Sequence, residues 1–94
     1  MRKLARTDAN QSDVVKDLRQ IGATVQTLHN LGRGCPDLLI GFRGVNYLVE
    51  LKDGDKFASQ QQLTMDERLW HDQWRGQVAV CNSLDEILNL IDAL

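Results

Sequence analysis

The sequence has few of the residues that build metal-stapled or disulfide-rich folds. Its 94 residues include only two cysteines, Cys35 and Cys81, far apart and in no Cys-x-x-Cys pair, and two dispersed histidines. We therefore do not expect a zinc site. Cys81 ends an apolar run and is interpreted as a small buried hydrophobic residue rather than half of a disulfide.

Long apolar stretches are also missing. No run approaches the roughly 20 residues of a membrane span, and the basic segment 1–6 lacks the apolar core of a secretory signal. We therefore expect no membrane partner and a cytoplasmic location. Residues 1–6 are interpreted as a flexible basic arm, and residues 7–94 as a single domain without repeats.

Charge is distributed unevenly along the chain, whose formal net charge is −2. Residues 1–56 carry nine Lys/Arg and seven Asp/Glu, whereas residues 57–94 carry two and six. A phosphate-binding face could therefore lie in the first half and an acidic face elsewhere. Scattered surface charges would give the same totals.

Periodicity and turn residues predict seven elements. A helix opens with the capping pair Asp8 and Gln11 and ends at Gly22, with an apolar face at Val14, Val15, Leu18 and Ile21. Strands are expected at 23–28, 38–42 and 47–52, the last two joined by a hairpin turn at 43–46. A polar loop at 53–62 precedes a helix capped by Thr64 and Glu67, then a buried central strand at 78–81 and a last helix capped by Ser83 and Glu86.

The resulting order, α-β-β-β-α-β-α, predicts an α/β fold with a mixed sheet flanked by helices. The strand at 78–81 follows a helix, so a parallel crossover is expected.

The stretch 35–52 carries the candidate chemistry. Asp37 begins one strand of the hairpin, and Glu50 lies near the end of the other. Glu50 and Lys52 are two residues apart, so on a strand they share a face, and Tyr47, Val49 and Leu51 take the opposite one. Charged side chains at the end of an apolar strand need a partner.

A divalent cation near Asp37 and Glu50 would be such a partner. Mg²⁺ or Mn²⁺ prefers oxygen ligands, and the carbonyl of Leu51 could be a third. Such an ion supports phosphodiester hydrolysis, with Lys52 placed to orient the attacking water and bind developing negative charge. Asp37 as a simple strand start and Lys52 as a solvated partner of Glu50 are the alternatives.

These residues resemble a known nuclease family. The segments Gly34-Cys35-Pro36-Asp37-Leu38-Leu39 and Val49-Glu50-Leu51-Lys52 look like the PD-(D/E)xK superfamily, and more closely like the small stand-alone, virus-type form of the VRR-Nuc domain. Segments 8–11, 52–54, 63–64 and 70–78 share the likeness, which covers about residues 7–92. The resemblance implies a restriction-endonuclease-like αβββαβ core plus a C-terminal helix, Mg²⁺- or Mn²⁺-dependent cleavage of structured DNA, and a homodimer.

Two positions depart from the family pattern. Gln11 stands where many members carry a metal-binding glutamate on the first helix; its amide oxygen can still ligate a metal or hold a metal-bound water. Asp13 is a candidate substitute on a different helix face. Glu67 stands where the later helix often carries a glutamine, and its position in a capping box favours a structural role.

Other residues have two interpretations each. Arg33, Gly34 and Lys56 are candidate nucleic-acid contacts near the site, although surface charge and a simple turn explain them equally well. Trp70 and Trp74 lie four apart on one helix, where core or dimer packing is favoured over base stacking. For His29 and His71, packing or solvent contact is favoured over proton transfer.

The sequence thus predicts a metal-dependent DNA endonuclease of a bacterial or phage-infected cell, selective for branched or Holliday-junction-like DNA, with no small-molecule cofactor. Asp37, Glu50, Lys52 and Gln11 would form the catalytic set, and Asp37, Glu50 and Leu51 would hold the metal. The alternative is a catalytically weak or inactive nucleic-acid-binding or assembly domain of the same fold. RNA cleavage is a third possibility.

Overall fold

A computed structural model describes residues 9–54 and 62–93 of the chain. Its elements are α1 (Ala9–Gln20), β1 (Thr24–Thr27), the 3-10 helix η1 (His29–Leu31), β2 (Leu38–Phe42), β3 (Val45–Leu51), α2 (Met65–Gln73), β4 (Ala79–Cys81) and α3 (Leu84–Leu90). The predicted order is confirmed, and η1 is an addition. The hairpin turn is shorter than the predicted 43–46, because β3 already begins at Val45, which pairs with Phe42. The arm at 1–6, the cap at Asp8, Lys56 and most of the loop at 53–62 lie outside the described residues.

The four described strands form one mixed sheet in the order β1-β2-β3-β4. The first three are antiparallel neighbours, and β4 runs parallel to β3, which confirms the predicted crossover. The prediction of a buried central strand at 78–81 is wrong. Among the described strands β4 pairs with β3 alone, and Val80 is 41% exposed. An apolar run this short does not distinguish a central strand from a half-covered edge strand.

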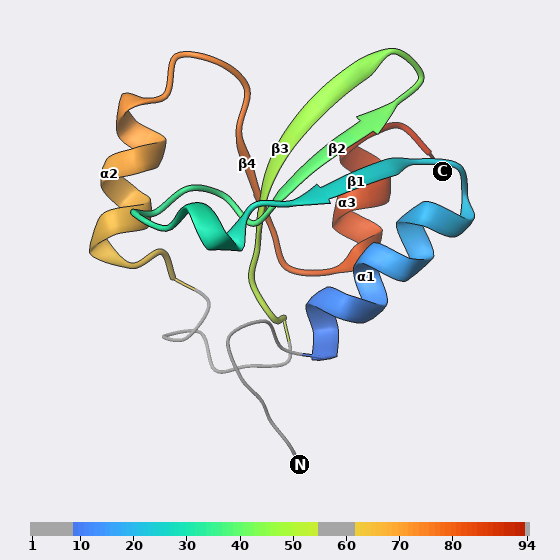
Figure 1. The fold of residues 1–94 in the computed structure, drawn as a ribbon, viewed down its shortest axis with the longest axis horizontal. Helices are drawn as coiled ribbons and strands as arrows, with labels where there is room; N and C mark the ends of the chain where they lie inside the picture. Colours follow the sequence, from blue (N-terminus) through green and yellow to red (C-terminus); the bar gives the residue numbers. More distant parts are fainter. Residues whose placement is uncertain (1–8, 55–61, 94) are drawn as a thin grey trace.

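Helices α1 and α3 cover one face of the sheet (Figure 1). Their apolar side chains meet the alternate residues of β2 and β3 that point to that face, as strand geometry requires. The fully buried members of this core include Leu18, Leu38, Ile40, Val49 and Ile87. Ile21, predicted on the buried helix face, is 47% exposed because α1 ends at Gln20 and the chain turns at Gly22.

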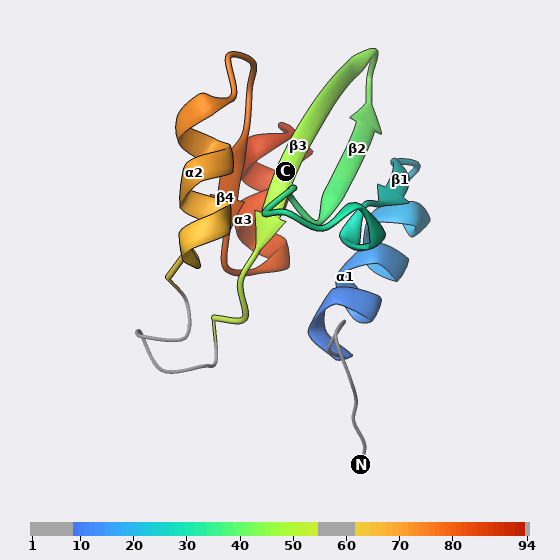
Figure 2. The same cartoon turned by 60° about the vertical axis from the view of Figure 1, so that its left-hand side comes forward.

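Helix α2 stands beside β4, on the opposite side of the molecule from α1 (Figure 2). None of its nine described residues is buried. Trp70 and Trp74 stack with ring centroids 4.5 Å apart, and Trp74 is exposed, so this residue does not pack in the core. The other part of the interpretation, packing in a dimer, stays a prediction. The helix therefore depends on its caps and on few tertiary contacts for its position.

Candidate active site

The register of the β2–β3 hairpin brings Asp37 and Glu50 together. Leu38 pairs with Val49, so one further step places Asp37 opposite Glu50. Asp37 is fixed on both sides: its carbonyl accepts a hydrogen bond from the Leu28 amide (2.8 Å), and its Oδ2 accepts one from the Leu51 amide (2.9 Å). The predicted meeting of the two carboxylates is therefore what the fold produces, on the sheet face away from Val49 and Leu51.

Glu50 is buried, whereas Asp37 is partly exposed. Glu50 is 2% exposed, and its Oε1 receives no hydrogen bond from a donor among the described residues. Burial, followed by the charge of Asp37, raises the pKa of Glu50 to about 9. Burial also raises the pKa of Asp37, against the opposing effect of the Leu51 hydrogen bond. Without a cation, the pair holds a proton at neutral pH.

Lys52 follows directly after β3 and lies between two carboxylates. Its Nζ is 2.7 Å from Glu67 Oε1 and 3.6 Å from Glu50 Oε2. Burial alone would lower the pKa of Lys52, but the hydrogen bond to Glu67 and the charges of Glu67, Glu50 and Asp37 outweigh it and raise the pKa. Lys52 is therefore an ammonium at neutral pH and a donor of hydrogen bonds.

Glu67 has a role that the sequence interpretation missed. The predicted capping box is present, because Thr64 Oγ1 accepts from the Glu67 amide and Glu67 Oε1 accepts from the Thr64 amide (2.9 Å). The same Oε1 also accepts from Lys52 Nζ. Burial would raise the pKa of Glu67, but the hydrogen bonds from Lys52 and Thr64 lower it. The later helix therefore supplies a partner for Lys52 as well as its own cap.

Gly34 explains how α2 reaches the site. A Cβ at this position would overlap the Asp66 carbonyl oxygen and lie 2.8 Å from the Glu67 amide nitrogen, and the backbone φ is +84°. Only glycine allows this close approach of the loop to the first turn of α2. The contact with α2 is thus sufficient to explain why position 34 is a glycine. The suggested contact of Gly34 with nucleic acid stays a prediction.

The other candidate residues lie around this centre. Arg33 is exposed in the same loop, with a left-handed φ of +57°. Gln11 is 8% exposed, engages a partner, and lines a cavity of about 300 Å³ between α1 and β1. Burial and the charges of Glu50 and Asp37 raise the pKa of the Cys35 thiol, and Cys81 is buried as predicted.

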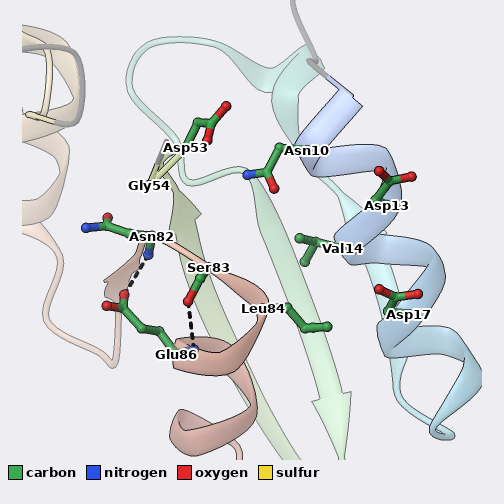
Figure 3. Close-up of a pocket in the computed structure, with 10 residues that line it drawn as sticks. All are labelled: Asn10, Asp13, Val14, Asp17, Asp53, Gly54, Asn82, Ser83, Leu84 and Glu86. Atoms are coloured by element: carbon green, nitrogen blue, oxygen red, sulfur yellow. Dashed lines mark hydrogen bonds between the residues drawn. The ribbon is translucent and has the colours of Figure 1, made fainter. Parts of the chain in front are cut away.

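A second cavity, of about 480 Å³, lies between α1, the segment after β3 and the start of α3 (Figure 3). Four of its lining residues are acidic: Asp13, Asp17, Asp53 and Glu86. Asp37, Glu50, Lys52 and Glu67 are not among the residues that line it. The cavity is therefore separate from the carboxylate pair.

The pair suits a small divalent cation. Among the described residues, no group of three or more His, Cys, Asp or Glu side chains is placed to hold a metal ion. Mg²⁺, however, is commonly bound by one or two carboxylates, with water and substrate phosphate completing its shell. The buried Oε1 of Glu50, which lacks a donor, is the kind of ligand such an ion needs.

The mixed sheet, the helix pair on one face and the carboxylates at the hairpin end define a restriction-endonuclease-like nuclease fold. A solved structure titled "VRR_NUC domain" matches the chain with a TM-score of 0.63 and 28% identity, over 87% of this chain and 89% of that one. This match supports a VRR-Nuc domain, and the PD-(D/E)xK superfamily follows from it. No family model and no curated protein matches the sequence. None of the described helices is long and apolar enough to cross a membrane.

The double role of Glu67 predicts a change in pH dependence. Glu67→Gln keeps an oxygen for the Thr64 amide but removes the charge that raises the pKa of Lys52. We expect the alkaline limb of the cleavage profile to move to lower pH and kcat/KM to fall about tenfold, as for the loss of a supporting contact. Profiles of kcat/KM against pH measure this. Glu86→Gln, the same change in the cap of α3, is the control, and an equal shift in both variants would contradict the assignment.

Proposed function

We propose that this chain is a metal-dependent endonuclease that hydrolyses DNA phosphodiester bonds, with a preference for branched DNA. The observation that supports it most is the pair formed by Asp37 and the buried Glu50, with the Lys52 ammonium beside it. Nucleases of this fold usually use divalent metal ions. Two carboxylates and a carbonyl oxygen are suitable ligands for such an ion, and the Lys52 ammonium adds a positive charge. Together they meet the needs of phosphodiester hydrolysis.

Each residue has a distinct task in this proposal. Asp37, Glu50 and the Leu51 carbonyl would hold Mg²⁺ or Mn²⁺, and Gln11 would support the metal or its water. When bound, the ion would lower the pKa of a water molecule and offset charge on the phosphate. Lys52, oriented by Glu50 and Glu67, donates hydrogen bonds to the oxygens on which negative charge grows.

The alternative is a domain of the same fold that binds nucleic acid without cutting it. Such a domain gains nothing from burying Glu50 beside Asp37, because burial of a carboxyl group costs free energy that the metal-free fold reduces only by keeping a proton on the pair. Glu50 carries this cost in the metal-free fold, as its raised pKa indicates. A site kept for metal chemistry accounts for the arrangement better than a binding surface does.

Nucleic acid would reach the site past the loop that precedes Asp37. Arg33 is exposed there, and in this proposal it contacts a phosphate; Gly34 lets the loop lie against α2. Arg33→Gly separates the role of the side chain from that of the backbone conformation. It removes the guanidinium, while glycine adopts the left-handed conformation readily. A cleavage defect in a variant at least as stable as the wild type would show that the side chain itself is needed.

We further infer that the active form is a homodimer, whose two sites would make paired cuts. Four large apolar side chains are exposed on α2, directly after it and on the edge strand β4: Met65, Leu69, Trp74 and Val80. Exposed apolar side chains are typical of an interaction site where they lie together.

A charged side chain introduced on this surface should therefore prevent the two copies of the chain from forming the dimer. Leu69→Lys is expected to shift the protein from dimer to monomer, with weaker binding to four-way junctions. Ile21→Lys is the matched control, since Ile21 has similar exposure and directly follows α1, which lies on the opposite side of the molecule from α2 (Figure 2). Light scattering measures both variants. A monomeric wild type, or a dimer that survives Leu69→Lys, would contradict this interface.

Cleavage assays test the enzymatic proposal directly. Purified protein is incubated with labelled four-way junction, flap, duplex and single-stranded DNA and with RNA, in Mn²⁺, Mg²⁺ or EDTA. Metal-dependent cutting of a branched substrate, lost in Lys52→Ala by roughly 10²–10³-fold, is the expected result. Binding without cutting on every substrate would favour the non-catalytic alternative.

A further inference from the structure

The two sides of α1 differ in charge. On one side lies the acidic cavity of Figure 3, lined by four carboxylates. On the other side, the cavity between α1 and β1 has no acidic residue among its described lining residues, which are Gln11, Ser12, Val15, Arg19, Thr27 and His29. A polyanion that approaches α1 meets repulsion on the first side and hydrogen-bond donors on the second.

The segment of the chain that leads from this cavity toward the catalytic centre also lacks acidic residues. The sequence has no aspartate or glutamate between Asp17 and Asp37, although the chain holds thirteen acidic residues. This segment comprises the end of α1, β1, η1 and the following loop, and it carries Arg19 and Arg33. The flank of the molecule along β1 is therefore the side on which phosphates are tolerated.

The register places the cavity close to the carboxylate pair. Thr27 pairs with Leu38, and the Leu28 amide donates to the Asp37 carbonyl, so Thr27 and His29 flank the residue bonded to Asp37. Neighbouring strands are about 5 Å apart, which puts the backbone of Glu50 about 10 Å from β1. Thr27 shares a face of the sheet with Leu38, on the side that α1 covers, so the cavity and the carboxylates lie at one end of the sheet but on opposite faces, with the edge strand β1 between them.

The donors in the cavity suit a phosphate. Arg19 donates from Nη2 to the Val25 carbonyl (2.9 Å), a bond that fixes the guanidinium beside β1. A guanidinium carries five N–H donors in a planar fork that matches phosphate oxygens. The hydroxyls of Ser12 and Thr27 are exposed donors from the two walls.

We propose that the cavity between α1 and β1 binds a backbone phosphate of the nucleic-acid substrate, close to the phosphate that is cut. This inference rests on the proposed function and adds to it the path of the substrate strand over the protein. The substrate strand runs from the carboxylate pair along the β1 flank and away from the acidic cavity.

Paired substitutions on α1 test this binding site. Arg19→Gln and Lys16→Gln each remove one positive charge from an exposed helix position, but Lys16 lines neither cavity. Binding of a labelled DNA oligonucleotide in EDTA is measured by fluorescence anisotropy over a range of salt concentrations. Arg19→Gln should weaken binding and reduce the slope of log Kd against log salt by about 0.7–0.9, the contribution of one phosphate contact. Lys16→Gln should leave the slope unchanged.

A second variant keeps the Arg19–Val25 bond intact. Ser12→Glu places a carboxylate in the cavity and is expected to weaken binding at least tenfold, whereas Asp13→Glu on the acidic side should have no such effect. Circular dichroism melting establishes that each variant is folded.

The outcomes separate this inference from the nuclease proposal. Wild-type binding by Ser12→Glu, together with equal binding by Arg19→Gln and Lys16→Gln, overturns the phosphate site even if the protein cuts DNA. Binding that depends on Ser12 and Arg19, without metal-dependent cutting, supports the site and contradicts the nuclease. A chain that binds no nucleic acid contradicts both.

Discussion

Glu50→Gln is expected to reduce metal-dependent cleavage by roughly 10²–10³-fold or more and, at the same time, to stabilise the metal-free protein. The first effect follows from the loss of a metal-ligating charge. The second follows from burial, because the wild-type fold holds a carboxyl group whose pKa is raised to about 9. A glutamine in this place has no charge to desolvate, and its amide can donate to Asp37. Opposite signs for activity and stability would distinguish a functional site from a structural one.

The sign of the pH dependence follows from linkage. In the wild type, the folded state keeps a proton on Glu50 that the unfolded state releases near the ordinary glutamate pKa of 4.5. The folded state therefore binds more protons, and stability falls as pH rises from about 4.5 toward 9. In Glu50→Gln, the free energy of unfolding should therefore lack this part of its decrease with pH.

Thermal unfolding with and without Mn²⁺ measures both effects. Mn²⁺ should raise the Tm of the wild type more at pH 8 than at pH 5, because the metal competes with the proton. It should raise the Tm of Glu50→Gln much less at either pH. Asp72→Asn, an exposed change on α2, serves as the control. Near wild-type cleavage by Glu50→Gln, or an unchanged response of its Tm to Mn²⁺, would contradict the metal site.

Gly34→Ala is expected to have the largest effect of any loop substitution. A left-handed φ costs alanine roughly 1–2 kcal/mol, and the added Cβ would also overlap the backbone of α2 at Asp66. The first turn of α2 must then move, and Glu67 moves with it, away from Lys52. We expect a loss of stability greater than the backbone cost alone and a fall in kcat/KM of about 10- to 100-fold.

Substitutions at two other glycines separate the packing part of the Gly34→Ala effect from the backbone part. Gly32 and Gly44 also have positive φ, +66° and +82°, but a Cβ at either would meet no atom of the described residues within 4 Å. Gly32→Ala and Gly44→Ala should therefore show the backbone cost with near wild-type activity. Urea unfolding and kcat/KM are measured for all three. Equal behaviour of Gly34→Ala and Gly44→Ala would show that the contact with α2 has no effect.

Most elements and the carboxyl pair could be predicted because their signals are local. Val14 and Leu18 follow the helical period, and Thr64 with Glu67 forms a capping box within one turn. In an antiparallel hairpin the sum of paired residue numbers is constant, so the observed turn at 43–44 places Asp37 opposite Glu50, whereas the predicted turn at 43–46 would have placed Asp37 opposite Lys52. The roles of these residues and of Gln11 in catalysis stay predictions.

What the sequence alone determined is therefore the order of the elements, the caps of α2 and α3, and the position of two acidic residues on the neighbouring strands of one hairpin. Only the tertiary structure decided that β4 is an edge strand, that Glu67 meets Lys52, and that Gly34 lies against Asp66. Each of these depends on how segments distant in the chain pack together. Periodicity and capping signals extend over a few residues, and they carry no information about which remote surface an element will contact.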